Sequence, residues 1–346
     1  MLNKGIYIYG IVPNIYSKEI DRSIHNSGAY TIPFHDLSAV VSNLESLPFN
    51  LSDRESLGYL LSHHQKTIET IMAKGFNMIL PMKFKTIVSD EGDVFSILSK
   101  GHDLITSALK NIENLTEVDL AVTWADFGGI LNEVANHPEI VAMKNNILKD
   151  IDKATQIDQV KIGMLIHEKL NENNKRVGMT VLETLSPICL NIKNHDVMND
   201  QMITNSAFLI NRDNKEQFER TVEQLDADFK DLLNFKLVGP LPCYSFYTVE
   251  VTSLNPEQVV QAKNGLGLRD ETTVSEIKKA YLEKAKLFHP DNGAENVDSE
   301  NFNRIQNAFQ TLLDYTAAAI QSSKDTFISL SEEKVVENLI LVKIKE

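Results

Sequence analysis

Residue patterns that could carry out catalysis or hold a metal are few in this chain, and each is incomplete. His63 and His64 are adjacent, so a helix cannot present both as ligands on one face. His167-Glu168 has no second histidine at the spacing of zinc proteases. Gly265-Leu266-Gly267 lacks the third glycine of a dinucleotide-binding motif, and Gly128-Gly129 leads to no phosphate-loop lysine. The sequence therefore predicts no catalytic residues, no metal site and no cofactor.

The two cysteines, Cys189 and Cys243, also show no pattern of a redox or metal site. Neither has a second cysteine at CxxC spacing or a histidine at metal-ligand spacing. We expect two buried, free thiols in a reducing compartment. The first apolar run, residues 5–12, is too short to span a bilayer and has no signal-peptide cleavage site, so a soluble cytoplasmic protein is expected.

A binding site of another kind is indicated by His289-Pro290-Asp291, which lies between two segments with helical spacing. Apolar residues recur at intervals of three and four over residues 274–288, and again over residues 302–313. Asn292-Gly293 supplies a turn, and residues 294–300 supply a polar loop. We expect an antiparallel helical hairpin with the tripeptide at its exposed tip.

This hairpin resembles the J domain of DnaJ-type co-chaperones over about residues 265–315. The segments that carry the resemblance are Leu266-Gly267-Leu268, residues 276–281 and residues 302–309. In that family, the tip and the basic face of the second helix bind a DnaK-type chaperone and stimulate its ATP hydrolysis. The resemblance assigns this contact to His289, Pro290, Asp291, Lys278, Lys279, Lys284 and Lys286. Lysines on a surface helix would steer an acidic partner, with modest and salt-sensitive affinity.

Three residues of the second helix depart from the J-domain pattern. Leu282 and Leu287 stand where family members often carry basic or polar side chains, and Glu283 reduces the positive charge of the helix. Two other interpretations therefore stay open. The chain could contain an ordinary helical hairpin that carries the tripeptide in its loop, or a J-like fold that has lost its partner.

Length and composition indicate a globular protein with two or three domains. A chain of 346 residues exceeds what one core usually serves. Its 42% hydrophobic and 24% charged residues are ordinary values for a packed core without extensive disorder. The net charge of −14 argues against nucleic acid and against anionic membranes as partners.

Strand and helix patterns alternate along the first part of the chain. Strands are expected at residues 6–12, 30–34, 37–44, 78–88 and 118–124, with helices at 53–74 and 90–112. This alternation is too regular for a helical bundle and predicts an α+β domain with helices on one sheet face. Helices are expected next at 138–153 and 157–185, followed by a β, β, α, β series at 188–192, 206–210, 215–233 and 244–251.

Most of residues 1–251 resembles the gas vesicle protein L/F family. Three motifs occur in the right order: residues 7–12 resemble its opening strand, residues 80–86 its LPxRFGT-like strand, and residues 239–246 its GPWPPYSF segment. His63-His64 and Ile162-Gly163 also fit. The departures are Lys85, Leu241 and Cys243, which stand where glycine, tryptophan and proline are usual.

The two resemblances together imply an α+β fold with four parts. These are a ferredoxin-like N-terminal domain over residues 1–127, a helical middle over 128–187, a second α+β domain over 188–255, and an all-α J-like module over 264–320. They imply a cytoplasmic, non-catalytic role in gas vesicle formation. The expected partners are the hydrophobic shell protein, a DnaK-type chaperone and other gas vesicle accessory proteins. The alternative is a minor structural component of the vesicle, in which the hairpin is only an interaction module.

Two further segments carry expectations. The residues Gly239, Pro240, Leu241, Pro242 and Tyr244 are candidates for a client-binding surface, against the plainer interpretation of a proline-stiffened turn. A C-terminal strand is expected within residues 335–346. If it pairs with the second sheet, the J-like module is an insertion, and we favour this arrangement because an unpaired apolar strand would be an exposed edge.

Overall fold

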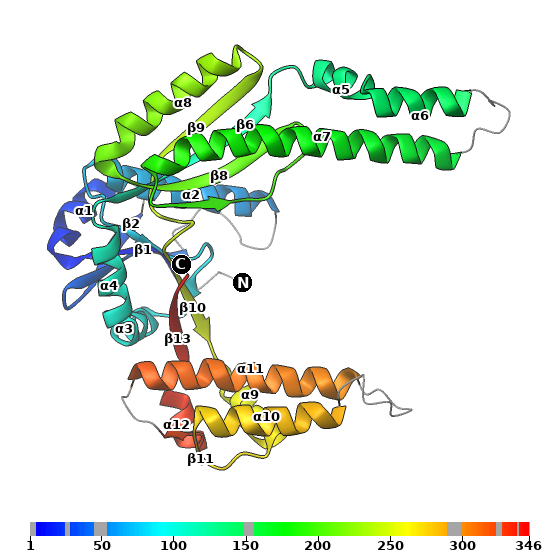
Figure 1. Ribbon diagram of the computed structural model, residues 1–346. Helices are drawn as coiled ribbons and strands as arrows, with labels where there is room; N and C mark the ends of the chain where they lie inside the picture. Colours follow the sequence, from blue (N-terminus) through cyan, green and yellow to red (C-terminus); the bar gives the residue numbers. More distant parts are fainter. Residues whose placement is uncertain are drawn as a thin grey trace. The chain divides into compact units, whose positions relative to one another are not determined.

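The computed structural model describes residues 5–24, 28–44, 54–148, 156–288, 299–322, 327–337 and 339–345 (Figure 1). The chain divides into two compact units. Unit 1 combines Met1–Glu113 with Tyr247–Glu346, and unit 2 comprises Asn114–Phe246. The first unit is therefore made of two stretches that are far apart in the sequence.

The N-terminal part of unit 1 is built on an antiparallel sheet with strand order β2-β3-β1-β4, and a short strand, β5, also pairs with β1. The strands are β1 (Ile6–Pro13), β2 (Ala29–Phe34), β3 (Leu37–Asn43), β4 (Leu80–Pro81) and β5 (Ile87–Val88). The helices are η1 (Asn14–Tyr16), α1 (Ser17–Ile24), α2 (Arg54–Ala73), α3 (Glu91–Lys100) and α4 (His102–Ile112). Central strand β1 is buried along almost its whole length, which explains its nearly unbroken apolar run.

The segment expected to be one strand over residues 78–88 is interrupted by a turn between β4 and β5. The amide of Thr86 donates a hydrogen bond to the carbonyl of Lys83 at 3.0 Å, and Lys85 between them has a φ of +69°. This left-handed backbone is strained for a residue with a Cβ and is readily adopted by glycine. The departure from the family motif at Lys85 thus falls where a glycine would fit with less strain.

A polar network lies inside this part of unit 1, where α2 packs on β1. The hydroxyl of Tyr7 lies 2.8 Å from Nδ1 of His64, and that of Tyr9 lies 2.9 Å from Nδ1 of His63. Tyr9 also donates to the hydroxyl of Ser42 at 3.0 Å. Burial, with a smaller contribution from the charge of His63, lowers the pKa of His64 to about 4. His64 is therefore a neutral hydrogen-bonding residue of the core.

Unit 2 contains a second antiparallel sheet, with strand order β7-β8-β6-β9. Its strands are β6 (Leu115–Trp124), β7 (Asn191–Asn194), β8 (Met202–Asn211) and β9 (Leu233–Leu241). Its helices are α5 (Phe127–Ala135), α6 (Pro138–Leu148), α7 (Gln156–Leu185), η5 (Ser186–Ile188), η6 (Arg212–Asn214) and α8 (Lys215–Phe229). The expected first domain, ending at residue 127, takes in β6, but β6 pairs with β8 and β9. Local pattern alone cannot assign a strand to a sheet, because its pairing partners are distant in sequence.

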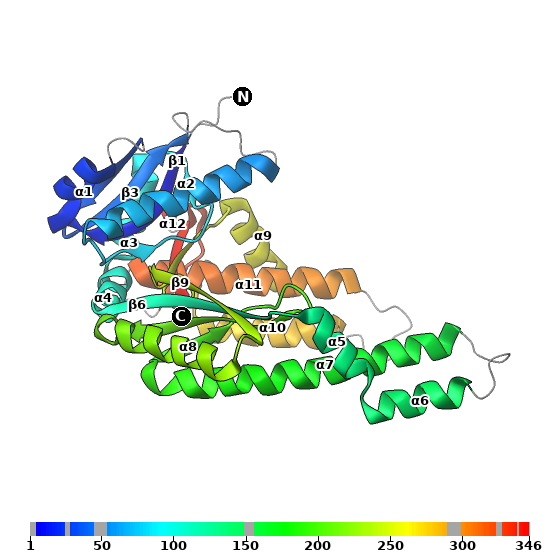
Figure 2. The same ribbon diagram turned by 90° about the horizontal axis from the view of Figure 1, so that it is seen from above.

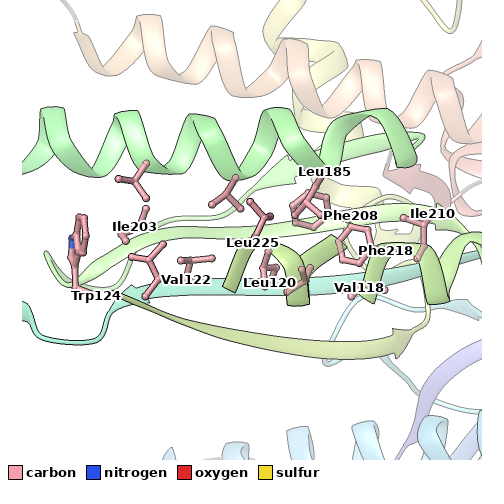
Figure 3. Close-up of a cluster of buried hydrophobic side chains, with 14 residues drawn as sticks. Val118, Leu120, Val122, Trp124, Leu185, Ile203, Phe208, Ile210, Phe218 and Leu225 are labelled. Carbon is pink, nitrogen blue, oxygen red and sulfur yellow. The ribbon is translucent and has the colours of Figure 1, made fainter. Parts of the chain in front are cut away.

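One face of the second sheet forms the core of unit 2 (Figure 3). Successive side chains of a strand point to opposite faces, so Val118, Leu120, Val122 and Trp124 of β6 share one face. They pack with residues of α7, α8 and β8 such as Leu185, Phe218 and Phe208, all labelled in Figure 3. Trp124 satisfies its buried indole N–H by donating to Oδ1 of Asn174 at 2.7 Å.

The two sheets have the same connectivity. In chain order, the four main strands are β1, β2, β3 and β4 in unit 1 and β6, β7, β8 and β9 in unit 2. In both sheets the spatial order is second, third, first, fourth. Helices connect the first strand to the second and the third to the fourth, which gives a β-α-β-β-α-β series in each unit. The ferredoxin-like arrangement of the N-terminal domain stays a prediction.

The remaining part of unit 1 begins with β10 (Thr248–Ser253) and ends with β13 (Ile340–Lys345). Between them lie α9 (Pro256–Leu266), β11 (Glu271–Thr272), α10 (Val274–Phe288), α11 (Ser299–Ser322), β12 (Ile328–Ser329) and α12 (Glu332–Glu337). β13 pairs with β10 in a separate two-stranded antiparallel sheet, so the expected C-terminal strand forms but does not extend the sheet of unit 2. The J-like module therefore lies between two paired strands of unit 1. No helix among the described residues is long and apolar enough to cross a membrane.

Candidate functional site

The J-like module has a core of its own, formed by α9, α10 and α11. Buried residues from these helices include Leu266, Ile277, Leu312 and Tyr315. The rings of Tyr281 and Phe309 stack with their centroids 4.1 Å apart. Helices α10 and α11 lie side by side in both views (Figures 1 and 2). The hairpin predicted from apolar spacing is thus present as two packed helices.

Local sequence explains where these helices begin and end. Asn255 caps α9, accepting from the amide of Glu257 at 2.8 Å, and Gly267 ends that helix with a φ of +73°. Thr273 and Glu276 form a reciprocal cap at the start of α10. The amide of Thr273 donates to Oε2 of Glu276 at 2.8 Å, and the amide of Glu276 donates to Oγ1 of Thr273 at 3.2 Å. Gly267 therefore has a structural role within the motif that resembles a J-domain entry.

The outer face of α10 combines positive and apolar side chains. Lys278, Lys279 and Lys286 are exposed, as the resemblance to J domains implies for a basic face. Leu282 and Leu287 on the same helix are 57% and 75% exposed. Because residues three and four apart are neighbours on a helix, Leu282 lies beside Lys278 and Lys279. The face that α10 offers to a partner is thus less positive than a row of lysines and includes apolar surface.

Lys284 differs from the other lysines of α10. Its Nζ donates to the carbonyl of Gly265 at 2.6 Å, in the last turn of α9. Carbonyl groups at the end of a helix lack partners within the helix, and the negative end of the helix dipole favours a cation there. Lys284 therefore joins α10 to α9 within the module, an interaction that helical spacing could not reveal. Its expected contact with a chaperone stays a prediction.

The residues expected at the tip of the hairpin, His289, Pro290 and Asp291, lie outside the described residues. The described part of α10 ends at Phe288, and that of α11 begins at Ser299. The two helices that would position the tripeptide are in place.

A second candidate site is the end of β9 and the segment that follows it. Gly239 and Pro240 are exposed, whereas Leu241 and Tyr244 are half-buried and Pro242 is buried. The carbonyl of Leu241 accepts a hydrogen bond from Oγ1 of Thr116 at 3.0 Å. Exposed surface is therefore concentrated at Gly239-Pro240. The client-binding assignment of these residues stays a prediction.

Ser245 anchors the chain after β9 to the second sheet, on the face opposite the core of unit 2. Its amide donates to Oε2 of Glu117 at 2.7 Å, and its hydroxyl donates to Oε1 of the same carboxyl at 2.8 Å. Its carbonyl accepts from Nζ of Lys193 at 2.8 Å, and this ammonium lies 5.5 Å from the centre of the Phe246 ring. Four side chains from β6, β7 and the segment itself thus hold residues 242–246 in place.

The anchor includes a buried acidic pair. Glu117 is 1% exposed, and burial raises its pKa to about 8, against the opposing effect of the hydrogen bonds from Ser245. Burial also raises the pKa of Asp119, and its Oδ1 is buried without a hydrogen-bond partner among the described residues. Nε2 of His195 lies 3.3 Å from the hydroxyl of Ser245. Because the pKa of Glu117 is about 8, its carboxyl is mainly protonated at neutral pH.

The sequence analysis missed Glu117, Lys193, His195 and Ser245 as a group. Alternation along β6 places Glu117 and Asp119 opposite the apolar residues, where acidic side chains are ordinarily solvated. The signal that was present is the long GPLPCYSF motif, which exceeds what a simple turn needs. It did not identify the strand on which the motif is anchored.

Neither the cysteines nor the acidic residues form a metal centre in the described part of the chain. Cys189 and Cys243 are free thiols, and burial raises the pKa of each to about 12. Such thiols are poor nucleophiles at neutral pH. Among the described residues, no group of three histidine, cysteine, aspartate or glutamate side chains could hold a metal ion.

Comparison with known proteins gives two matches that divide the chain. The family model described as gas vesicle synthesis protein GvpL/GvpF matches residues 5–248, and the DnaJ domain model matches residues 264–320. Gas vesicle protein F of Dolichospermum flosaquae is 27% identical over 247 residues, which cover 70% of this chain and 96% of that protein. The mitochondrial DnaJ homolog 1 of Saccharomyces cerevisiae is 35% identical over 89 residues, covering 25% of this chain and 17% of that protein.

A solved structure supports the fold. The crystal structure of gas vesicle protein GvpF from Anabaena sp. PCC7120 has a TM-score of 0.56 and 22% identity, and covers 70% of this chain and 95% of that chain. The mixed helix-and-sheet fold and the helical DnaJ domain expected from the sequence are both confirmed. The GvpL/GvpF model matches well over half of the chain. This protein therefore belongs to the gas vesicle synthesis protein GvpL/GvpF family and carries a DnaJ domain near its C-terminal end.

Proposed function

We propose that this protein is a gas vesicle assembly factor that binds the hydrophobic shell subunit and recruits a DnaK-type chaperone to it. The observation that supports the proposal most is the presence of two modules in one chain. Residues 5–248 match a gas vesicle family, and residues 264–320 match a co-chaperone domain. A shell subunit rich in apolar surface is prone to aggregate before it assembles, so a protein that holds it and brings a chaperone serves that step.

The chaperone contact is assigned to His289, Pro290 and Asp291 together with the lysines of α10. Lys278 and Lys279 support this assignment because they are exposed on the outer face of the helix. Lysines in this position would attract an acidic surface of the chaperone and raise the rate of association at low salt.

Client binding is assigned to the gas vesicle part of the chain, with Gly239 and Pro240 as the exposed part of the candidate surface. The assembly factor would work in the cytoplasm in association with gas vesicles and their other accessory proteins. Its role would be non-catalytic, because its two modules are those of a gas vesicle protein and a co-chaperone.

The test is the rate at which a purified DnaK-type chaperone hydrolyses ATP in the presence of the full chain. We expect wild-type protein to stimulate hydrolysis and His289→Gln to abolish the stimulation with the fold intact. Gln306→Ala, an exposed substitution on α11, is the matched control and should leave stimulation unchanged. Equal stimulation by wild type and His289→Gln would refute the chaperone part of the proposal. Failure of the full chain to bind the shell subunit in a pull-down would refute the client part.

A second candidate function is a structural component of the vesicle, in which the J-like module is only a contact surface. The observation that favours it is the exposure of Leu282, Glu283 and Leu287, which weakens the positive face of α10. Stoichiometric retention of the protein on purified vesicles, with normal vesicle yield after chaperone depletion, would support this function over the first.

A further inference from the structure

The segment that contains the J-like module leaves and re-enters the rest of unit 1 through two adjacent strands. β10 and β13 pair antiparallel over six residue pairs, from Thr248 with Lys345 to Ser253 with Ile340. One residue further, the amide of Leu254 donates to the carbonyl of Leu339 at 2.6 Å. Both ends of the inserted segment, residues 254–339, are therefore fixed within the spacing of neighbouring strands, about 5 Å.

This pair of strands, here called the ribbon (β10 and β13), is attached to the N-terminal sheet. The amide of Lys83 donates to the carbonyl of Val249 at 2.8 Å, and Met82 forms a parallel bridge with Val249. Nζ of Lys83 lies 3.2 Å from Oε1 of Glu250. The ribbon is thus hydrogen-bonded to Met82 and Lys83, the two residues that follow β4.

A close contact attaches the other strand of the ribbon. Val342 of β13 is buried against Gly101, the residue between α3 and α4. A Cβ at Gly101 would lie 2.8 Å from Cγ1 of Val342 and 2.8 Å from Cδ1 of Ile105. Only glycine allows β13 to approach this closely.

The J-like module is itself held against the ribbon by α11. Nζ of Lys343 on β13 donates to Oδ1 of Asp314 on α11 at 2.8 Å. Ala318 and Ala319, one turn further along α11, are buried, and α11 also contacts α3. The lysines Lys278, Lys279 and Lys286 and the leucines Leu282 and Leu287 on the outer face of α10 are exposed.

We propose that the ribbon holds the J-like module in one orientation on the N-terminal domain within unit 1, so that α10 presents its outer face to a chaperone in one direction. This inference rests on the proposed function. A J-like module on a flexible linker would recruit a chaperone to any position within reach of the linker. Here the contacts of α11 with β13 fix the direction in which α10 presents its exposed face.

Freeing the module should remove the fixed orientation and leave the chaperone contact intact. The test variant carries a six-residue Gly-Ser insertion between Ser253 and Leu254, another between Leu339 and Ile340, and Asp314→Ala, which removes the bond from Lys343 on the ribbon to α11. Each insertion lies between the last residue pair of the ribbon and a leucine, Leu254 or Leu339, that packs against the core of the module. Six flexible residues have a root-mean-square span of roughly 13 Å, so orientation and position would vary on that scale. The matched control carries the same insertion after Val197, in the exposed connection between β7 and β8.

The measurement is a distance distribution between two spin labels on the full chain, with both native cysteines replaced by alanine. One label is placed at Lys110 on α4 and the other at Gln306 on α11, both exposed positions. A second pair, at Gln261 and Gln306, lies within the module and shows whether the module stays folded. Wild type and the control should give a narrow distribution for the first pair, and the double insertion should broaden it by 10 Å or more. The second pair should be narrow in all three proteins.

A broad distribution for the first pair in wild type, or a narrow one in the double insertion, would overturn the inference. Chaperone ATP hydrolysis and vesicle yield in cells complete the test. The double insertion should stimulate ATP hydrolysis like wild type but lower vesicle yield, and normal yield would refute the functional part of the inference. If wild-type protein does not stimulate chaperone ATP hydrolysis, the proposed function is refuted. The distance distributions would still decide whether the orientation of the module is fixed.

Discussion

Replacing Glu117 with glutamine should increase the stability of unit 2 at neutral and alkaline pH. Burial raises the pKa of Glu117 from 4.5 to about 8, so the folded protein keeps a proton that the unfolded chain has released at pH 7. A group whose pKa is higher in the folded state than in the unfolded state stabilises the folded protein fully at pH values below the unfolded pKa, here 4.5. This stabilisation is lost as the pH rises toward the folded pKa of about 8. At pH 7 the loss corresponds to about 3 kcal/mol relative to pH 4, from 1.4 kcal/mol per pKa unit.

Glutamine preserves the geometry of the anchor while removing the titration. Its carbonyl can accept from the amide of Ser245, and its amide group can donate to the hydroxyl of Ser245. Glu117→Gln should therefore match wild type at pH 4 and exceed it by up to about 3 kcal/mol at pH 7. Glu117→Ala removes the anchor, leaves a cavity and should be less stable than the glutamine variant at every pH.

The assay is urea unfolding from pH 4 to pH 9, followed by the fluorescence of Trp124. This is the single tryptophan of the chain and lies in the core of unit 2, so its signal reports that unit. Glu223→Gln, an exposed substitution on α8, is the matched control and should give a pH profile parallel to that of wild type. Parallel profiles for wild type and Glu117→Gln would show that Glu117 does not hold a proton in the folded state, and would refute the reasoning.

Four further predictions follow from single contacts. Lys85→Gly should stabilise unit 1 by about 1 kcal/mol in chemical unfolding, because it removes the strain of a left-handed residue; a loss of stability would show that the lysine side chain matters more. Leu282→Lys should increase stimulation of chaperone ATP hydrolysis at low salt and lose the gain at high salt, whereas reduced stimulation would make the leucine itself a contact. Lys284→Ala should destabilise the module by about 1 kcal/mol through the lost bond to Gly265, seen as faster amide exchange in α9, and unchanged exchange would contradict this. Burial depresses the pKa of His64 from 6.5 to about 4, so the neutral ring stabilises unit 1 fully above pH 6.5. This contribution to the free energy of unfolding falls by about 3 kcal/mol as the pH drops to 4. A His64→Gln variant that loses as much stability in acid as wild type would contradict this prediction.

Elements with a strong local pattern could be predicted from the sequence. The apolar spacing over residues 274–288 corresponds to α10 (Val274–Phe288), and the expected helix at 157–185 corresponds to α7 (Gln156–Leu185). Proline punctuation also worked, since β1 ends at Pro13 and α6 begins at Pro138. These features depend on residues within a few positions of one another, which is the information that a local pattern contains.

Features that depend on distant residues could not be predicted in this way. The membership of β6 in the second sheet is decided by pairing with β8 and β9. The burial of Glu117 depends on a segment more than a hundred residues further along the chain. Lys284 has the spacing of a surface lysine, and only the packing of α10 against α9 shows that its ammonium is engaged. In each case the residue type and local spacing were compatible with a different environment.

The inserted segment, residues 254–339, leaves and re-enters the gas vesicle part of the chain at two paired residues. Ser253 and Ile340 are opposite each other at the end of the ribbon, so a two-residue turn such as Asn-Gly would join them as an ordinary β-hairpin. A co-chaperone domain could thus be gained or lost at this site during evolution by exchanging residues 254–339 for a hairpin turn between two strands that are already paired.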